Sequence, residues 1–83
     1  MREPVWIKVN EEPHAIALAQ ELVGMPGLDV HQTSEGWEVR VEGLNGDRGL
    51  VRILDSVRTA LAGDTSASAL VVLDGREYRM RGE

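Results

Sequence analysis

Two features of this 83-residue chain could do chemistry by residue type and spacing: a glycine-spaced loop and a pair of histidines. The loop, Gly43-Leu44-Asn45-Gly46-Asp47-Arg48-Gly49, leads into a predicted helix, and Arg52 follows shortly after it. Glycine-rich backbone at the start of a helix can bind phosphate or another anion through its N–H groups. However, Asp47 would repel an anion there, and the spacing matches neither a P-loop nor a dinucleotide-binding motif. We therefore expect a plain connection, with binding of a small anion as the alternative.

The histidines and serines form no recognisable catalytic or metal-binding pattern. His14 falls in the first turn of a predicted helix, and His31 faces Glu38 across a predicted hairpin. A metal site needs further ligands at matching spacing, and the chain has no cysteine. No general base stands in a recognisable relation to the serines, which are Ser34, Ser56, Ser66 and Ser68. We therefore expect surface histidines, no catalytic residues, no metal and no cofactor, in a protein that is not an enzyme.

Composition restricts the class of partner. The formal net charge of −5 disfavours non-specific binding to nucleic acid or to an anionic membrane. The absence of cysteine excludes disulfides and thiolate catalysis. No signal-peptide pattern stands at the N-terminus, and no apolar run approaches membrane-spanning length. We therefore expect a small acidic cytoplasmic protein with a single domain, residues 1–83.

One pattern occurs twice and organises the predicted elements. Residues 35–43 and 74–82 both contain the pattern acid-Gly-x-Glu-apolar-Arg-apolar-x-Gly. The acid-Gly pair predicts a tight turn, and the alternation after it predicts a half-buried strand. We infer two quasi-repeated α-β-β units, about 13–43 and 50–82, behind an opening strand. If the two hairpins are equivalent, Val39 and Val41 should lie where Tyr78 and Met80 lie.

Two predicted helices show an apolar stripe. The first begins with Asn10 as N-cap, has Pro13 in its first turn and runs to about Val23. The second, capped by Asn45 or Asp47, ends before Gly63. The first stripe contains Ala15, Leu18, Ala19 and Leu22, and the second contains Leu50, Leu54, Val57 and Leu61. Off the second stripe lie Arg52, Ser56, Arg58 and Thr59.

Five predicted strands alternate between apolar and polar residues. We choose the register that gives favourable side-chain pairs on both faces of each hairpin. The strands cover residues 5–9, 28–32, the segment after Gly36, 69–73 and 76–81. The expected core pairs are Val30–Val39, Leu28–Val41, Gln32–Trp37, Val71–Tyr78 and Ala69–Met80. The expected outward pairs are Asp29–Arg40, His31–Glu38, Leu70–Arg79 and Val72–Glu77.

The element order β-α-β-β-α-β-β predicts an α+β, ferredoxin-like fold with one added C-terminal strand. Short connections and right-handed crossovers favour a mainly antiparallel sheet in the strand order 5-4-1-3-2, with both helices on one face. Many unrelated functions use this architecture, so it does not by itself define a function.

The face of the sheet without helices is the predicted functional site. There Trp6 would lie beside Leu70 and Val72, with charged residues around them, like a hot spot with a polar rim. The predicted partner-binding residues are Trp6, Lys8, Arg40, Leu70, Val72 and Arg79. We therefore expect a non-enzymatic protein–protein interaction module, either a homodimer or a small subunit or adaptor of a larger bacterial assembly.

Other functions remain as alternatives. The segment from Asp47-Arg48-Gly49-Leu50 to Leu61 resembles the opening loop and first helix of ACT-type amino-acid-sensing domains, although here it follows the third strand. That resemblance implies a small-ligand regulatory domain with a pocket at the Gly43–Gly49 loop. The C-terminal helix, strand, Asp-Gly-Arg and last strand resemble small effector-associated domains of bacterial defence systems. An acidic inhibitor or immunity protein that mimics a polyanion is a further alternative.

An RNA-recognition module shares the core topology but needs stacking aromatic residues on both central strands. Trp6 lies on one of these strands, whereas Glu38, Arg40 and Glu42 occupy the outer face of the other. Together with the acidic net charge, this arrangement argues against RNA binding.

Overall fold

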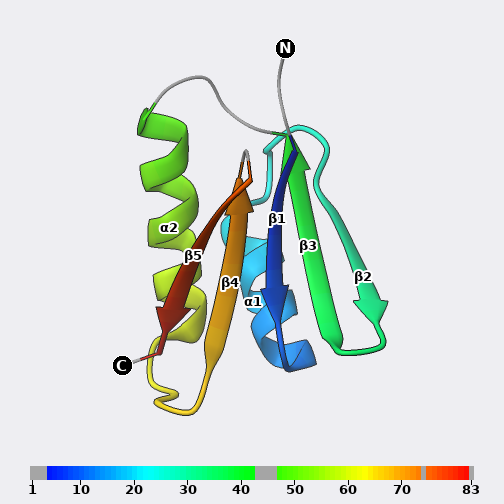
Figure 1. Cartoon of the computed structure of the whole chain (residues 1–83), viewed down its shortest axis with the longest axis vertical. Coiled ribbons are helices and arrows are strands. Elements are labelled where there is room, and N and C mark those ends of the chain that lie inside the picture. The colour runs from blue at the N-terminus through cyan, green and yellow to red at the C-terminus, as the bar shows by residue number, and fades with distance from the viewer. Residues whose placement is uncertain (1–3, 43–46, 74, 83) are drawn as a thin grey trace.

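A computed structural model of the chain describes residues 4–42, 47–73 and 75–82. Its elements in chain order are β1 (Pro4–Val9), α1 (Glu12–Glu21), β2 (Asp29–Thr33), β3 (Gly36–Glu42), α2 (Asp47–Leu61), β4 (Ser68–Leu73) and β5 (Arg76–Arg81). Figure 1 shows the strands side by side with the two helices behind them. Within the described ranges, no helix combines the length and apolarity needed to span a membrane.

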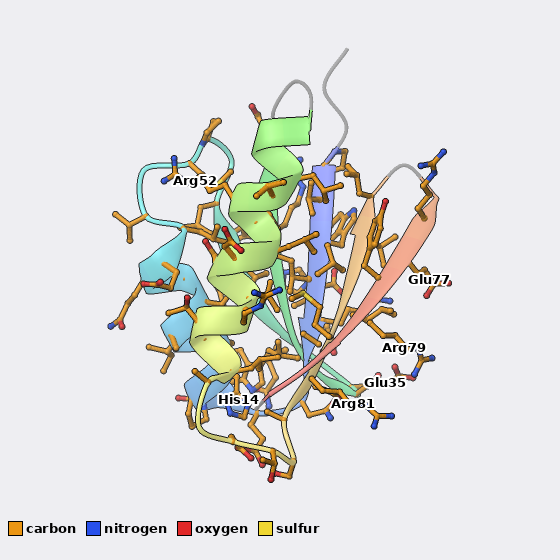
Figure 2. All side chains as sticks on the ribbon, turned by 90° about the vertical axis from the view of Figure 1, so that its left-hand side faces the viewer. His14, Glu35, Arg52, Glu77, Arg79 and Arg81 are labelled. Carbon is orange, nitrogen blue, oxygen red and sulfur yellow. The ribbon has the colours of Figure 1, made fainter. Side chains whose placement is uncertain are left out.

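The five strands form one sheet in the order β2-β3-β1-β4-β5, and every neighbouring pair is antiparallel. Both helices cover the same face of this sheet (Figure 2). The predicted α+β, ferredoxin-like fold with an added C-terminal strand is therefore confirmed, including the strand order. β1 pairs with β3 on one side and with β4 on the other, so it is the central strand of the sheet.

Between the helices and the sheet lies one apolar core. Alternate residues of β1, β3 and β4 point into it, as the period of a strand requires. Each helix contributes one stripe. The largest fully buried side chains are Ile7, Leu18, Leu22, Ile53, Leu61, Val5, Val39, Val41, Val57 and Val71.

The predicted registers of both hairpins are confirmed at the paired positions. In the first hairpin Val30 pairs with Val39, and Asp29 pairs with Arg40. In the second hairpin the observed pairs include Val71–Tyr78, Ala69–Met80, Leu70–Arg79 and Val72–Glu77. Because a slip of one residue would exchange the two faces, this register decides which side chains point away from the helices.

The ends of α1 differ from the prediction. Glu11, not Asn10, is the N-cap: its backbone is extended and its carbonyl accepts a hydrogen bond from the Ala15 N–H at 3.2 Å. Pro13 lies in the first turn, where its missing N–H costs no helical hydrogen bond. The helix ends at Glu21 rather than near Val23, because the chain turns through Gly24 in the left-handed region, at φ 92°.

The buried stripe of α2 is also partly different. Val57 and Leu61 are buried as predicted, but Leu54 is only partly buried, and Ile53 and Ser56 take the central positions. Ser56 was predicted to lie off the stripe, and this prediction was wrong because Ser56 is buried, with 8% of its surface exposed. Its hydroxyl donates to the backbone carbonyl of Arg52 at 2.9 Å, so burial leaves no unpaired polar atom. Asn45, the alternative N-cap, lies outside the described residues.

In the two copies of the repeated motif, corresponding strand residues point toward the core, but the turns occupy different positions. Val39 and Val41 are buried, and Tyr78 and Met80 pack against the same core, so the predicted facing is confirmed. In the first hairpin, however, Thr33 pairs with Gly36, which leaves residues 34–35 as the turn.

The second hairpin has its turn one residue later in the motif. Leu73 pairs with Arg76, so residues 74–75 connect the strands; Asp74 lies outside the described residues. Gly36 therefore belongs to a strand, and the prediction that Glu35-Gly36 forms the turn was wrong. A Cβ on Gly36 would stand only 2.6 Å from the carbonyl oxygen of Val9. The backbone of β1 thus passes too close to this position for any residue with a side chain.

The end of β5 is held against the loop between α2 and β4. Gly82 is buried, and its N–H donates to the carbonyl of Ala67 at 3.0 Å. A Cβ at this position would collide with the carbonyl oxygens of Leu61 and Asp64. A glycine is therefore required here by space rather than by backbone conformation.

We predict that Gly82→Ala lowers the free energy of unfolding by about 1–3 kcal/mol, because the new methyl group must displace backbone atoms. Urea unfolding followed by circular dichroism would measure this change. Arg81→Ala, at the neighbouring exposed position, is the control and should cost less than about 0.5 kcal/mol. Equal midpoints for the two variants would contradict the prediction.

Candidate functional site

Two rows of side chains cross all five strands on the face of the sheet away from the helices, here called the outer face. In sheet order, the Trp6 row consists of Asp29, Arg40, Trp6, Val72 and Glu77. The Lys8 row consists of His31, Glu38, Lys8, Leu70 and Arg79. Figure 2 shows Glu77 and Arg79 on the side of the sheet that faces away from α2.

The structure brings all six predicted partner-binding residues together on this face. Trp6, Arg40 and Val72 belong to the Trp6 row, while Lys8, Leu70 and Arg79 belong to the Lys8 row. Lys8 and Arg79 are exposed, and the other four are half-buried. Their use in binding a partner stays a prediction, but their assembly on one surface is a property of the fold.

Trp6 is partly covered by polar neighbours rather than by the core. The guanidinium carbon of Arg40 lies 5.7 Å from the centroid of the Trp6 rings, a cation–π arrangement. The imidazole of His31 meets the indole edge to face, with centroids 6.4 Å apart and planes at 83°. These contacts hold a large aromatic side chain on the surface in a defined orientation.

The contact between Trp6 and His31 was missed by sequence reasoning. The two residues are on β1 and β2, which are separated in the sheet by β3. The one available signal was that the predicted register directs both side chains away from the helices. His31 also lies 3.6 Å from Asp29 and 3.5 Å from Glu38, measured from ring nitrogen to carboxylate oxygen. These distances are longer than those of typical hydrogen bonds, and the contacts place polar groups around Trp6.

Hollows open on and beside the outer face in the part of the chain that the structure describes. One is lined by Trp6, Lys8, Glu38 and Val72, at the centre of the two rows. Another lies toward the ends of β4 and β5, and its lining includes Lys8, Glu35, Arg79 and Arg81. Charges of both signs therefore border the half-buried apolar residues.

A second group of polar residues joins α1 to the loop after α2. His14 Nε2 lies 3.2 Å from Asp64 Oδ2, and His14 Nδ1 lies 3.8 Å from Glu11 Oε2. The side chain of His14 is only 11% exposed, so the prediction of a surface histidine was wrong here. Sequence reasoning missed this group because Asp64 reaches His14 only in the tertiary structure.

The three ligand atoms of Glu11, His14 and Asp64 lie within 4.8 Å of one another, a set that could hold a metal ion. Contacts within the chain already explain its arrangement. Asp64 Oδ1 accepts hydrogen bonds from the N–H of Ser66 at 3.0 Å and from its hydroxyl at 2.6 Å. The group thus acts as a polar connection between two segments, and the expected absence of a metal stays a prediction.

The hydrogen bonds from Ser66, first from its hydroxyl and then from its N–H, lower the pKa of Asp64 below its usual 3.8. The positive charge available on His14 acts in the same direction. A carboxyl with a lowered folded-state pKa stabilises the fold above its unfolded pKa, and this contribution is lost as the pH falls through the folded value.

We predict that Asp64→Asn is less stable than the parent chain at about pH 6, and that the difference narrows below about pH 4 because the parent carboxyl becomes protonated. Urea midpoints at several pH values would measure it. Asp55→Asn, at an exposed position of α2, controls for the loss of one negative charge. A stability difference that does not change with pH would rule out the ionised Asp64 as its cause.

Comparison of the chain with protein-family models, with curated proteins and with solved structures found no match. What the chain does is therefore inferred from the chemistry and placement of the outer-face residues.

Proposed function

We propose that the chain is a non-catalytic interaction module that binds a protein surface through the outer face of its sheet. The observation that carries this proposal is the unequal use of the two sheet faces. Both helices lie on one face, whereas the other carries Trp6, Leu70 and Val72 half-exposed to solvent. An aromatic residue with aliphatic neighbours, surrounded by charges, has the composition of a protein–protein hot spot.

The energetics support a moderate affinity. The apolar area that Trp6, Leu70 and Val72 still expose is on the order of 100 Å², which contributes about 2–3 kcal/mol when buried. Association costs several kcal/mol, so these residues need further contacts around them. The charged residues around them, such as Asp29, Glu77 and Arg79, can supply these contacts and fix the orientation of the partner. The partner surface should therefore have an apolar centre and charges of both signs.

The alternatives receive less support. A small-ligand pocket at the Gly43–Gly49 loop would involve residues 43–46, which lie outside the described ranges. A polyanion mimic needs a surface of one sign, whereas the outer face carries Lys8, Arg40 and Arg79 among its acidic residues. Neither alternative is favoured by a specific observation.

We predict that Trp6→Glu leaves the fold intact and weakens association, because the side chain is on the outer face and not in the core. Far-UV circular dichroism would report the fold, and light scattering would report the mass. Ile7→Ala, at the adjacent and fully buried position, is the contrasting variant and should lose about 2–5 kcal/mol of stability. An unfolded Trp6→Glu chain would mean that Trp6 is needed by the core.

The partner can be identified by placing a photoreactive amino acid at Val72 and recording the cross-linked products by mass spectrometry. The control position is Val51, which is 55% exposed on α2. The proposal expects a defined protein adduct at Val72 that is missing at Val51 and is lost in the Trp6→Glu background. Equal yields at the two positions would overturn it, whether the adduct contains a second copy of the chain or another protein.

A further inference from the structure

The arrangement of charges on the outer face identifies a partner for it, and this inference rests on the proposed function. Two copies of one surface can meet about a two-fold axis, so that each residue i faces a residue j and each j faces an i. When two sheets pack face to face, their strands are aligned to within about 30°. Two limiting orientations of the axis are therefore available: along the strands or across them.

An axis along the strands, centred on β1, brings each row against itself. Lys8 would then face Lys8 of the second copy, and Asp29 would face Glu77 of the second copy. Both contacts join like charges at an interface, which costs binding free energy. The sequence of charges along the rows therefore disfavours this orientation.

An axis across the strands, passing between the two rows at the level of Ile7, brings the Trp6 row against the Lys8 row. Trp6 then faces Lys8, a cation–π pair, and Val72 faces Leu70, an apolar pair. At the remaining positions Arg40 faces Glu38, Asp29 faces His31, and Glu77 faces Arg79. All five strands thus place complementary groups opposite each other.

Contacts within the chain do not account for the whole pattern. On β2 and β3, residues of opposite charge are already neighbours in the sheet, since Asp29 lies opposite Arg40. On β5, by contrast, Glu77 pairs with Val72 and Arg79 pairs with Leu70, both of them apolar. In the sheet, neither Glu77 nor Arg79 lies opposite a charged residue, whereas the other row of a second copy would place an opposite charge against each of them.

We propose that the chain forms a homodimer in which two outer faces pack against each other, with the two-fold axis running across the strands between the Trp6 row and the Lys8 row. A face of five strands, each about 20 Å long and about 4.8 Å from its neighbour, has an area on the order of 500 Å². Two such faces together reach roughly 1,000 Å², the lower limit for a specific interface. An interface of this size fits a weak or transient dimer.

Charge reversal on β5 tests this geometry. Glu77→Lys and Arg79→Glu should each weaken the dimer about tenfold, because each change places like charges opposite each other twice about the axis. The double variant Glu77→Lys/Arg79→Glu restores opposite charges and should recover the parent affinity. Sedimentation velocity from about 1 µM to 1 mM would measure all four proteins, and circular dichroism would confirm that each is folded. Asp55→Lys and Arg52→Glu, at exposed positions of α2, are matched controls and should not change the affinity.

The outcomes separate this inference from the proposed function. A parent chain that stays monomeric to about 1 mM would overturn the homodimer, while an outer-face adduct to another protein would still support the proposed function. A dimer strengthened by Glu77→Lys would indicate the axis along the strands and overturn the orientation proposed here. A dimer that neither Trp6→Glu nor the β5 reversals affect would show that the copies meet at another surface and would overturn the homodimer proposed here, while the cross-linking at Val72 would still test the proposed function. Weakening by each single reversal with recovery in the double variant would support the homodimer.

Discussion

The pairing of β1 with both β3 and β4 is the interaction on which the rest of the structure depends. It makes β1 the central strand, so that Ile7 is fully buried against the helices while Trp6 is directed to the opposite face. A shift of β1 by one residue against both neighbours would place Trp6 in the core and Ile7 in solvent. The same two ladders therefore determine both the apolar core and the composition of the outer face.

Polar contacts outside the apolar core also connect the helices and the sheet. His14 at the start of α1 contacts Asp64 in the loop after α2, and Gly82 at the end of β5 contacts the same loop through Ala67. Asp64 in turn accepts two hydrogen bonds from Ser66. This small polar group lies away from the outer face, at the end of the molecule where His14 is labelled in Figure 2. It gives the histidine and the acidic residues a structural role that requires no ligand.

The outer face combines two properties that a purely structural surface does not need together. Trp6 is held in a fixed orientation by Arg40 and His31, so little side-chain freedom would be lost when a partner covers it. Charged residues of opposite sign stand two positions apart on β3 and on β5, which gives the surface an internal complementarity. In protein interfaces generally, an apolar centre supplies affinity and the charges around it select one orientation of the partner. This combination is the basis of the proposed function.

Local patterns in the sequence determined the strands, the order of elements and the direction in which each strand residue points, because alternation of period two and cross-strand pairing are short-range properties. They were sufficient to place Trp6, Leu70 and Val72 on one surface. The stripe of α2 was not determined by local pattern, since Ile53 and Leu54 are adjacent apolar residues and packing against the sheet decided that Ile53 is the buried one. The turn of the first hairpin was decided by the approach of the Val9 carbonyl to Gly36, a contact between segments far apart in the chain. The grouping of His14 with Asp64 and the contact of Trp6 with His31 likewise required the tertiary structure, because each joins residues whose separation in sequence carries no local signal.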